Sequence, residues 1–307
     1  RGVEGFARAY AAERPDLVVV LGDRYEMLAA AVAALPFALP VAHIHGGEES
    51  EGAIDNQIRH AITKLAHLHF ASADLHARHI ADMGEEAWRI HPVGAPGLDR
   101  IAGTATLDRG AVAEALDLPA AGRWIVVTFH PVTLEHAETA RHVDELVAAL
   151  DKVEGTLVLT YPGADTGARA ITERLEELAE RDRRCRLVKS LGDRLYLSLL
   201  RHADLMVGNS SSGLIEAPSF ELPAVNVGAR QRGRLRGENV VDVEPTSADI
   251  LRGIEQALAP DFRARLRGRP NPYGDGRAAP RIVDVLRTVR IDARLVQKRL
   301  APREGGR

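Results

Sequence analysis

The sequence predicts an α/β protein made of two doubly wound domains that face a cleft. Three observations support this fold class. Short apolar runs alternate with amphipathic helical patterns along most of the chain, which is typical of parallel sheets covered by helices. The length of 307 residues corresponds to two domains at roughly 150 residues each. Polar, glycine-rich stretches follow many of the apolar runs, and ligands of such sheets bind beyond the carboxyl ends of the strands.

The N-terminal half opens with a helical pattern and then alternates between strands and helices. Apolar side chains recur at helical spacing within residues 1–16, and the uninterrupted apolar run 17–21 predicts a buried parallel strand. Residues 25–34 predict a helix that Pro36 closes. Further elements are predicted at residues 40–44 (strand), 54–65 (helix), 67–71 (strand), 73–83 (helix) and 88–93 (strand).

The C-terminal half repeats this alternation after a linker. Residues 104–121 predict a linker with one short helix, and a strand over residues 123–129 opens the second set. A last helix over residues 281–289 carries an apolar stripe at helical spacing. Between them, strands are predicted at residues 156–160, 186–189, 203–208 and 224–227, and helices at residues 138–150, 168–181, 195–201 and 213–220.

The composition narrows the class of protein. Lys and Arg number 40 and Asp and Glu number 43, so the net charge of −3 argues against a broad basic face for nucleic acid or a membrane surface. Hydrophobic residues make up 45% and charged residues 27%, which is ordinary for a soluble globular protein. The single cysteine, Cys185, cannot form an internal disulfide, and no apolar run reaches the ~18 residues of a membrane span. We therefore expect a cytoplasmic protein.

The strongest local motif is Gly-Asn-Ser-Ser-Ser-Gly at residues 208–213, which lies between an apolar strand and a predicted helix. Such a turn presents backbone N–H groups and hydroxyls at the positive end of a helix, which favours binding of a diphosphate. The candidate contacts are Ser210, Ser211, Ser212 and Gly213. The alternative is a solvated loop with an ordinary serine N-cap. The chain has no Walker lysine at this turn and no G-x-G-x-x-G, which disfavours nucleoside triphosphate and NAD sites.

Three more side chains are candidates for the same ligand. Glu216 lies one turn into the predicted helix, where a carboxylate could accept two ribose hydroxyls or be a solvated surface group. His130 follows the first strand of the second half and is either a diphosphate contact or proton donor, or a turn histidine before proline. Arg230 follows another strand and could contact phosphate or orient its loop, although a solvated cationic loop is the alternative.

A second constellation follows the first two strands. Asp23 ends one strand, His45 and Glu48 follow the next, and Asp55 and Arg59 begin the helix after it. Crowded carboxylates in a partly dry cleft have raised pKa values, which proton abstraction from carbon requires. The alternatives are a helix N-cap for Asp23 and a solvated i, i+4 pair for Asp55 and Arg59.

Three histidines, His43, His45 and His60, also allow a metal-binding interpretation. We disfavour it, because the glycine-rich spacing is looser than a typical zinc motif and only one cysteine is present. One of the three is better explained as a core histidine bonded to the backbone.

Taken together, these segments resemble the hydrolysing UDP-N-acetylglucosamine 2-epimerases, of the type that makes precursors of sialic and legionaminic acids. The matching segments keep their order along the chain, which makes the resemblance specific where one segment alone would not be. They are Gly-Asp-Arg-Tyr-Glu (22–26), His-Ile-His-Gly-Gly-Glu (43–48), Glu-Gly-Ala-Ile-Asp (51–55), Arg-His-Ala-Ile-Thr-Lys (59–64), His-Pro-Val-Thr (130–133), the serine turn (208–213), Arg-Gln (230–231) and Asn-Pro-Tyr-Gly-Asp-Gly (271–276).

The resemblance implies the glycosyltransferase-B fold, with two Rossmann-like domains and a last helix that crosses back to the first domain. On this basis we place the N-terminal domain at residues 1–118 with the crossing helix at 281–302, and the nucleotide-binding domain at 119–280. The resemblance also implies a UDP-sugar substrate, a homodimer or homotetramer, and no cofactor or metal.

The implied reaction eliminates UDP from UDP-N-acetylglucosamine to form a 2-acetamidoglucal and then adds water to give N-acetylmannosamine. By position, Asp23 and Asp55 match the acid/base carboxylates of the family, and His130 matches the histidine near the diphosphate. Ser210 and Ser211 match serines that bind the diphosphate in the family. Glu216 matches the glutamate that binds the ribose, and Arg230 matches an arginine near the nucleotide.

Two features depart from the family. Some members carry a third acidic residue where this chain has His45, so that role falls to His45 itself or to the nearby Glu48. The family also opens with a strand and a Gly-Thr-Arg turn whose basic residues grip the diphosphate, and nothing before Leu17 supplies them. We therefore expect the sequence to be N-terminally incomplete and the 307-residue chain to be weakly active or inactive.

Three alternatives stay open at this point. The first is the same chemistry on UDP-2,4-diacetamido-2,4,6-trideoxyglucose. The second is a glycosyltransferase of the same fold, against which the dense carboxylate set around Asp23, Glu48 and Asp55 argues. The third is an inactive fragment that binds nucleotide sugars.

Overall fold

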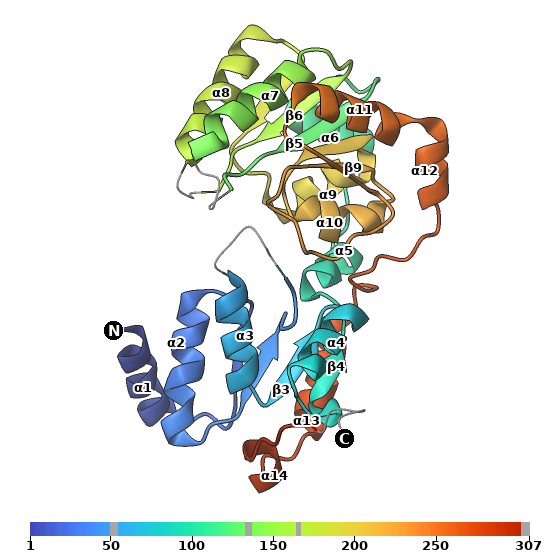
Figure 1. Cartoon of the computed structure of the whole chain (residues 1–307). Coiled ribbons are helices and arrows are strands. Elements are labelled where there is room, and N and C mark those ends of the chain that lie inside the picture. The colour runs from blue at the N-terminus through green and yellow to red at the C-terminus, as the bar shows by residue number, and fades with distance from the viewer. Residues whose placement is uncertain (50–54, 133–136, 164–166, 302–307) are drawn as a thin grey trace, which may run out of the picture. The chain divides into compact units, whose positions relative to one another are not determined.

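The computed structural model describes residues 1–49, 55–132, 137–163 and 167–301 (Figure 1). Contacts between residues divide the described chain into two units. Unit 1 contains the described residues up to 102 together with residues 273–301, and unit 2 contains the described residues from 103 to 272.

Unit 1 is built on a four-stranded parallel sheet with the strand order β1-β2-β3-β4. The strands are β1 (Val18–Leu21), β2 (Val41–Ile44), β3 (Leu68–Ala71) and β4 (Ile90–Pro92). Helices α1 (Gly2–Glu13), α2 (Tyr25–Ala34), α3 (Asp55–Leu65) and α4 (Asp74–Asp82) alternate with them. Because all four strands run in the same direction, their carboxyl ends meet at one edge, and the polar turns after β1 and β2 are neighbours there.

The two faces of this sheet have separate cores. Val41 packs with α1, α2 and α3, whereas its neighbour Ala42 packs on the opposite face, because successive side chains of a strand alternate between faces. That second face is covered by Ile282 of α13 (Ala278–Thr288) and Leu295 of α14 (Ala293–Val296). Helices α13 and α14, drawn in red tones near the end of the chain in Figure 1, therefore pack against the first sheet, as the predicted fold class requires.

Unit 2 contains a six-stranded parallel sheet with the order β10-β9-β8-β5-β6-β7. The strands are β5 (Trp124–Thr128), β6 (Thr156–Thr160), β7 (Cys185–Val188), β8 (Leu205–Gly208), β9 (Ala224–Val227) and β10 (Val240–Val243). This is the Rossmann order, in which the chain starts in the middle, runs to one edge and then returns to fill the other side. The order reverses between β5 and β8.

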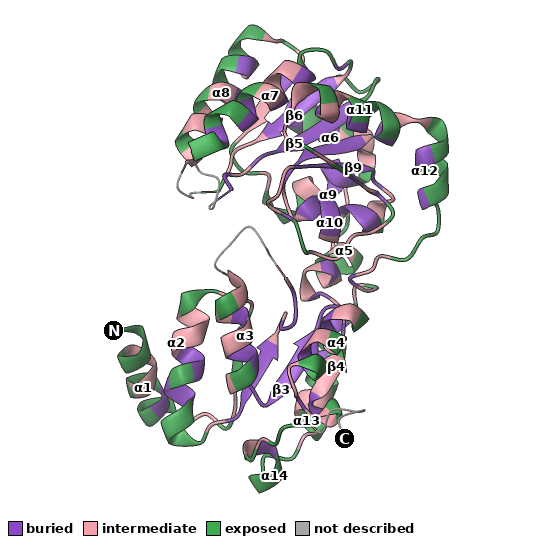
Figure 2. Cartoon of the chain, viewed as in Figure 1, coloured by how far each residue is buried: buried purple, intermediate pink, exposed green. Residues whose placement is uncertain are grey.

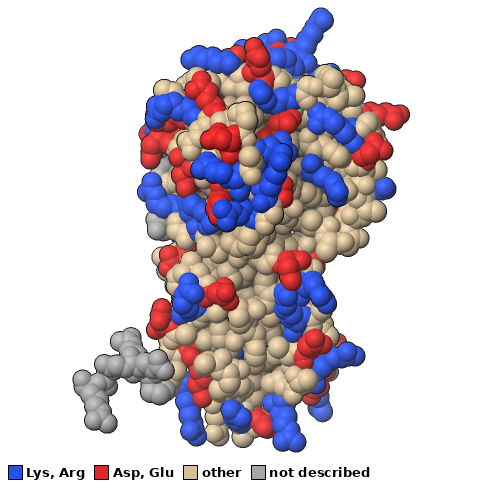
Figure 3. Space-filling model, turned by 90° about the vertical axis from the view of Figure 1, so that its right-hand side faces the viewer, with Lys and Arg blue, Asp and Glu red and all other residues tan. Residues whose placement is uncertain are grey.

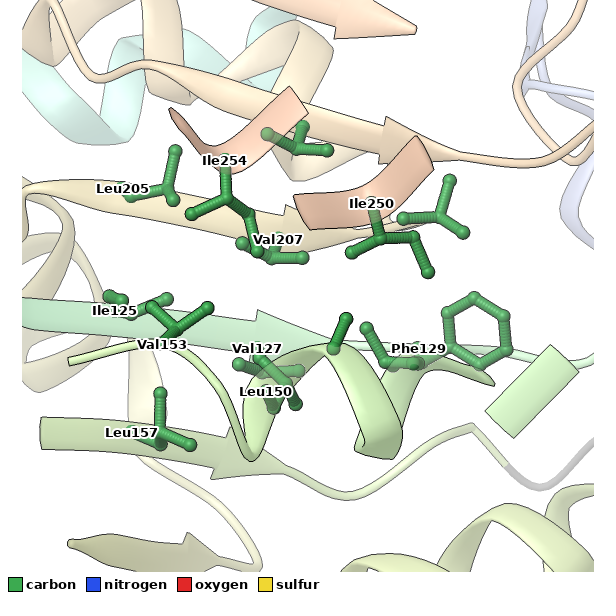
Figure 4. Packing of buried hydrophobic residues seen from close by; sticks show 14 of the residues in the cluster. Ile125, Val127, Phe129, Leu150, Val153, Leu157, Leu205, Val207, Ile250 and Ile254 are labelled. Carbon is green, nitrogen blue, oxygen red and sulfur yellow. The ribbon is translucent and has the colours of Figure 1, made fainter. Parts of the chain in front are cut away.

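Helices cover both faces of the second sheet. Figure 4 shows one face, where Ile250 and Ile254 of α11 (Ser247–Leu258) lie over Val207 of β8, and Leu150 of α7 (Thr139–Leu150) lies beside Val127 of β5. On the other face, Val126 and Met206 pack with Leu199. The other helices of unit 2 are α6 (Arg109–Leu116), α8 (Ala168–Arg181), α9 (Gly192–His202), α10 (Ser212–Ile215) and α12 (Pro260–Leu266). Figure 2 shows that the strands are largely buried between these layers, which explains their uninterrupted apolar sequences.

Shorter elements complete the described chain. Helix α5 (Asp99–Gly103) follows a 3-10 turn, and the 3-10 turns are η1 (Leu35–Phe37), η2 (Ala87–Arg89), η3 (Pro96–Leu98) and η5 (Ala217–Phe220).

The predicted α/β class with two parallel sheets, each alternating with helices, is confirmed, with differences in individual elements. The sequence analysis missed β10, α5, α11 and α12, and the crossing helix predicted over residues 281–302 is instead the two helices α13 and α14. The helix predicted over residues 213–220 is instead the single turn α10 followed by η5, because Pro218 cannot continue an α-helix. Helix α6, which the sequence analysis assigned to the first domain, packs through Val112 and Leu116 onto Trp124 in unit 2.

The surface agrees with the balanced composition. On the face drawn in Figure 3, basic and acidic side chains are interspersed, with no broad area of one sign. None of the described helices combines the length and the apolar character that a bilayer span requires.

Candidate functional site

The switch point of the second sheet carries the motifs that the sequence analysis singled out. His130 follows β5, and the turn 208–213 follows β8, its neighbour in the sheet. In open α/β sheets the crevice at such a reversal is where ligands bind. The register of the two strands pairs Thr128 with Gly208, so both turns leave the sheet at the same level.

Asn209 joins these two turns. Its amide oxygen accepts a hydrogen bond from the backbone N–H of His130 (2.7 Å), and its amide nitrogen donates to the carbonyl of His130 (2.8 Å). The side chain is completely buried. The preceding Gly208 has a φ of +136°, and a Cβ there would lie 1.9 Å from the carbonyl oxygen of Thr128. Only glycine therefore allows the turn to leave the strand this closely.

The serine turn is held from several sides. The hydroxyl of Tyr196, from α9, donates to the hydroxyl of Ser212 (2.6 Å), and the backbone N–H of Ser212 bonds to the hydroxyl of Ser210 (3.3 Å). Ser211 occupies the N-cap position of α10, but its side chain makes no capping bond. The simple N-cap alternative is therefore wrong for Ser211. The amide of the buried Asn239 donates to the carbonyl of Gly213 (3.0 Å).

Two side chains support this turn from the loop after β9. Arg230 and Gln231 both donate to the carbonyl of Asn209, at 3.1 and 2.8 Å. This bond ties the loop of Arg230 to the serine turn, and both predicted roles of Arg230 stay predictions. Glu216 lies at the C-cap of α10, one turn after Ser212. His130 accepts a bond from the backbone N–H of Gly163 on its Nδ1 (3.1 Å).

A cavity of about 350 Å³ opens beside this cluster. It is lined by the ends of three strands, at Thr128, Thr160 and Val188, and by Tyr196. Burial raises the pKa of Tyr196, so this residue is a neutral hydrogen-bond donor at ordinary pH. Unit 2 thus combines hydroxyl groups, a histidine and a concave space at one sheet edge.

In unit 1, Asp23 and Arg59 form a salt bridge. Asp23 lies in the turn after β1, Arg59 lies on α3, and the guanidinium is almost completely buried. Nη1 of Arg59 also donates to the carbonyl of Glu48 (2.7 Å) and to Oδ1 of Asn56 (3.0 Å). Helix α2 begins after Arg24 without a side-chain cap, so Asp23 is not the predicted N-cap but an ion-pair partner.

Glu48 is the centre of a second set of contacts. Its Oε1 lies 2.5 Å from Nδ1 of His45 and 2.5 Å from the hydroxyl of Ser72, and this hydroxyl lies 2.8 Å from Nδ1 of His76. Burial alone would raise the pKa of Glu48, but the contacts with His45, Ser72 and His76 outweigh it and lower the pKa. The expectation of raised carboxylate pKa values is therefore wrong for Glu48, which is ionised.

His43 is the predicted core histidine. Burial lowers its pKa to about 3, so the ring is neutral, and its Nε2 lies 2.8 Å from the carbonyl oxygen of Gly22. This bond fixes the turn that carries Asp23. Within the described ranges, no group of three or more His, Cys, Asp or Glu side chains is placed to hold a metal ion.

Contacts thus link four of the predicted residues of unit 1: Asp23, Arg59, Glu48 and His45. Asp55 is the first residue of α3, one turn before Arg59. Part of the motif at residues 51–55 and Thr133 lie outside the described residues. The sequence analysis missed the roles of Ser72, His76, Tyr196, Asn209 and Asn239.

Comparisons with known proteins define the class. The sequence pattern of the UDP-N-acetylglucosamine 2-epimerase family matches residues 1–287. Solved structures share the fold. The structure of the Neisseria meningitidis UDP-GlcNAc 2-epimerase bound to UDP-GlcNAc matches this chain with a TM-score of 0.82 at 17% identity. The match covers 94% of this chain and 80% of that chain. The Methanocaldococcus jannaschii UDP-GlcNAc 2-epimerase in complex with UDP-GlcNAc and UDP has a TM-score of 0.76 at 18% identity, with 93% and 79% covered. The fold is thus glycosyltransferase-B-like.

Curated relatives are more similar in sequence. The UDP-N,N'-diacetylbacillosamine 2-epimerase (hydrolyzing) of Legionella pneumophila is 37% identical over 295 residues, which cover 96% of this chain and 76% of that protein. The GDP/UDP-N,N'-diacetylbacillosamine 2-epimerase (hydrolyzing) of Campylobacter jejuni is 36% identical, with 84% and 67% covered. The UDP-N-acetylglucosamine 2-epimerase of Neisseria meningitidis is 37% identical, with 80% and 64% covered. This chain belongs to the UDP-N-acetylglucosamine 2-epimerase family.

Proposed function

We propose that this protein hydrolyses a UDP-linked 2-acetamido sugar and inverts the sugar at C2. With UDP-N-acetylglucosamine and water as reactants, the products are N-acetylmannosamine and UDP. The observation that carries the proposal is the contact network of unit 1, in which an ion-paired aspartate and an imidazole–carboxylate pair lie at neighbouring strand ends. Such groups serve proton transfer, whereas simple transfer of a sugar to an acceptor needs no proton removal from carbon.

The reaction has two steps. In the first, a base removes the proton from C2, the C2–H electrons form a C1=C2 double bond, and the bond from C1 to the diphosphate oxygen breaks, releasing UDP. In the second, water supplies a hydroxyl group to C1, and an acid returns a proton to C2 from the opposite face. One water is consumed, and no oxidant or reductant is needed.

We assign the acid and base roles to residues of unit 1. Asp23 and Asp55 are the acid/base carboxylates, and the buried Arg59 holds Asp23 in place through its salt bridge. Glu48 does not act as an acid, since its carboxyl group is already ionised. The third proton-transfer role falls to the His45–Glu48 pair.

Unit 2 binds UDP in this proposal. Charge develops on the departing diphosphate, and the serine turn stabilises it with hydroxyl groups that the bonds from Tyr196 and Asn239 hold in place. His130 lies at the neighbouring strand end as a further diphosphate contact. Glu216 accepts the ribose hydroxyls, and Arg230 positions the turn through the carbonyl of Asn209.

A second substrate has its own support. Two of the relatives, at 37% and 36% identity, are named as hydrolysing epimerases of diacetylbacillosamine nucleotides. UDP-2,4-diacetamido-2,4,6-trideoxyglucose carries the same C2 acetamido group and the same leaving group, so the chemistry above applies to it unchanged. The two candidates differ at C4 and C6 of the sugar.

The experiment is product NMR in heavy water, with the product of the complete gene and each UDP-sugar in turn. We expect release of UDP and a free manno-configured 2-acetamido sugar with deuterium at C2, and the larger kcat/KM identifies the substrate. Transfer of the intact sugar to an acceptor would indicate a glycosyltransferase. Calorimetric UDP binding without turnover would indicate a nucleotide-sugar sensor.

A matched variant separates binding from chemistry. Asp55→Asn keeps the size of the side chain and removes its capacity to take up a proton. We expect it to abolish exchange of deuterium into C2 while UDP affinity stays unchanged. Normal exchange would remove Asp55 from the acid/base set.

A further inference from the structure

We propose that a relay of His76, Ser72 and Glu48 fixes the tautomer of His45 so that its free Nε2 is a base in the reaction, an inference that rests on the proposed function. Ser72 and His76 are positioning residues in this scheme, since they act only through Glu48.

The four side chains come from three neighbouring elements of unit 1. His45 and Glu48 lie in the loop after β2, Ser72 directly follows β3, and His76 lies on α4. The distances along the relay are 2.8 Å from His76 Nδ1 to Ser72 Oγ, 2.5 Å from Ser72 Oγ to Glu48 Oε1, and 2.5 Å from Glu48 Oε1 to His45 Nδ1. Each is a hydrogen-bonding distance.

With Glu48 ionised, the hydrogens along the relay can be assigned in only one consistent way. An ionised carboxylate accepts hydrogen bonds and has none to give, so both His45 Nδ1 and Ser72 Oγ donate to Glu48. The single hydroxyl hydrogen of Ser72 is then used, and His76 Nδ1 must donate to Ser72. A neutral His45 with its proton on Nδ1 has a lone pair on Nε2, which is the form that takes up a proton.

The relay leads from the interior toward solvent. Ser72 and His76 are buried, and the side chain of Glu48 is only 6% exposed, whereas the side chain of His45 is 20% exposed. Burial lowers the pKa of His76 to about 4, so this ring stays neutral and delivers one defined hydrogen to Ser72. His45 is therefore the end of the relay that a substrate can reach.

The backbone holds the relay in one geometry. His45 has a φ of +65°, a left-handed conformation that is uncommon for a residue other than glycine. Two positions further, a Cβ at Gly47 would lie 2.3 Å from the carbonyl oxygen of His76, so only glycine lets the loop pack this closely on α4. Nη1 of Arg59 anchors the carbonyl of Glu48 at 2.7 Å. Strain maintained by such contacts is typical of functional loops.

The same contacts link His45 to the ion pair of the proposed acid/base set. Arg59 bonds to the backbone of Glu48 and to the carboxylate of Asp23. An imidazole oriented by a buried carboxylate is the arrangement that makes histidine an effective base in serine proteases. We infer that the imidazole of His45 takes the proton-transfer role that a third carboxylate has in related chains.

The first test reads the tautomer directly and needs no substrate. In protein labelled with [15N]histidine, two-bond 1H–15N spectra distinguish a protonated from an unprotonated ring nitrogen, and His45→Gln identifies the His45 signals by their loss. We expect a protonated Nδ1 and an unprotonated Nε2 in the native protein. Glu48→Leu, which removes the acceptor of the Nδ1 hydrogen, should shift His45 toward the other tautomer, whereas Ser72→Ala, which keeps the carboxylate, should shift it less. A native His45 protonated on Nε2 would overturn the proposal.

The second test measures turnover of the UDP-sugar with the product of the complete gene. Glu48→Gln and His45→Gln should each lower kcat by about 10²–10⁴-fold, the range of general acid–base catalysis, while the Kd for UDP changes less than twofold. Ser72→Ala should lower kcat less, and should add nothing once Glu48 is replaced. Unchanged kcat in Glu48→Gln and Ser72→Ala would exclude the relay. Lack of turnover by the native protein would instead count against the proposed function, and the NMR result separates the two failures.

The matched control is His91→Gln. This variant also replaces a histidine with glutamine in the first sheet, on β4, where the His91 ring contacts Phe70. We expect its His45 signals and its kcat to equal those of the native protein.

Discussion

Replacing Asn209 with alanine tests whether the switch point of unit 2 is held together as described. The change removes the acceptor for the His130 N–H (2.7 Å) and the donor to the His130 carbonyl (2.8 Å) in a fully buried position. Leaving a buried polar group without its partner costs about 1–3 kcal/mol. The two groups that lose their partner belong to the half-buried His130, so the loss in the free energy of unfolding of unit 2 should fall in the lower part of about 2–6 kcal/mol, against the 5–15 kcal/mol typical of a domain.

The assay is urea unfolding followed by tryptophan fluorescence. The chain has two tryptophans, so in a Trp88→Phe background the signal comes from the buried Trp124 of unit 2. The matched control is Asn226→Ala, which loses one bond of 2.7 Å to Asp242. The Asp242 side chain is 48% exposed, so water replaces that bond and the loss should stay near 1 kcal/mol. Equal losses in the two variants would refute the role given to Asn209.

Three further predictions concern a hydroxyl of the serine turn, the first glycine of that turn and the core of unit 1. Ser211→Ala should weaken UDP binding by about 10- to 150-fold in calorimetry, since a hydrogen bond to a charged group contributes about 1.5–3 kcal/mol; unchanged affinity would exclude the hydroxyl as a phosphate contact. Gly208→Ala should prevent folding of unit 2, because its Cβ would lie 1.9 Å from the carbonyl oxygen of Thr128; a native circular dichroism spectrum and melting curve would contradict this. Burial alone would raise the pKa of Glu85, but hydrogen bonds from His69, Lys298 and Lys64 lower it from 4.5 to about 2. These bonds therefore stabilise unit 1 fully above pH 4.5, and the stabilisation is lost as the pH falls toward 2. Glu85→Gln should remove that part of the pH dependence in urea titrations and cost about 3–5 kcal/mol at pH 7, and an unaltered pH profile would disprove the assignment.

The sequence was sufficient to predict the alternation of strands and helices. Uninterrupted apolar runs mark strands buried on both faces, and the helical stripes between them mark the covering helices. The prediction for β6 (Thr156–Thr160) and that for α8 (Ala168–Arg181) match the structure at both ends. Helix α11 was missed, although Ile250, Ile254 and Ala257 form a stripe at helical spacing and the side chain of Thr246 caps its start.

The partners within the site were harder to predict, because they are far apart in the sequence. Asn209 and His130 are 79 positions apart, and Ser72 and Glu48 are 24 positions apart. Only the order and register of the parallel strands bring these residues together. The sequence also led to a wrong expectation for the pKa of Glu48, since the hydrogen bonds that lower it come from Ser72 and His45, and burial alone would have raised it.

The most direct test of the proposed chemistry is the isotopic composition and configuration of the sugar product formed in heavy water. Proton removal at C2 followed by return from solvent predicts N-acetylmannosamine, or its 4-acetamido-6-deoxy analogue, with one deuterium at C2 and one UDP released per sugar. A product that retains hydrogen at C2 or keeps the gluco configuration would contradict an elimination–hydration mechanism. The same spectrum, recorded for His45→Gln, shows whether the imidazole takes part in that exchange.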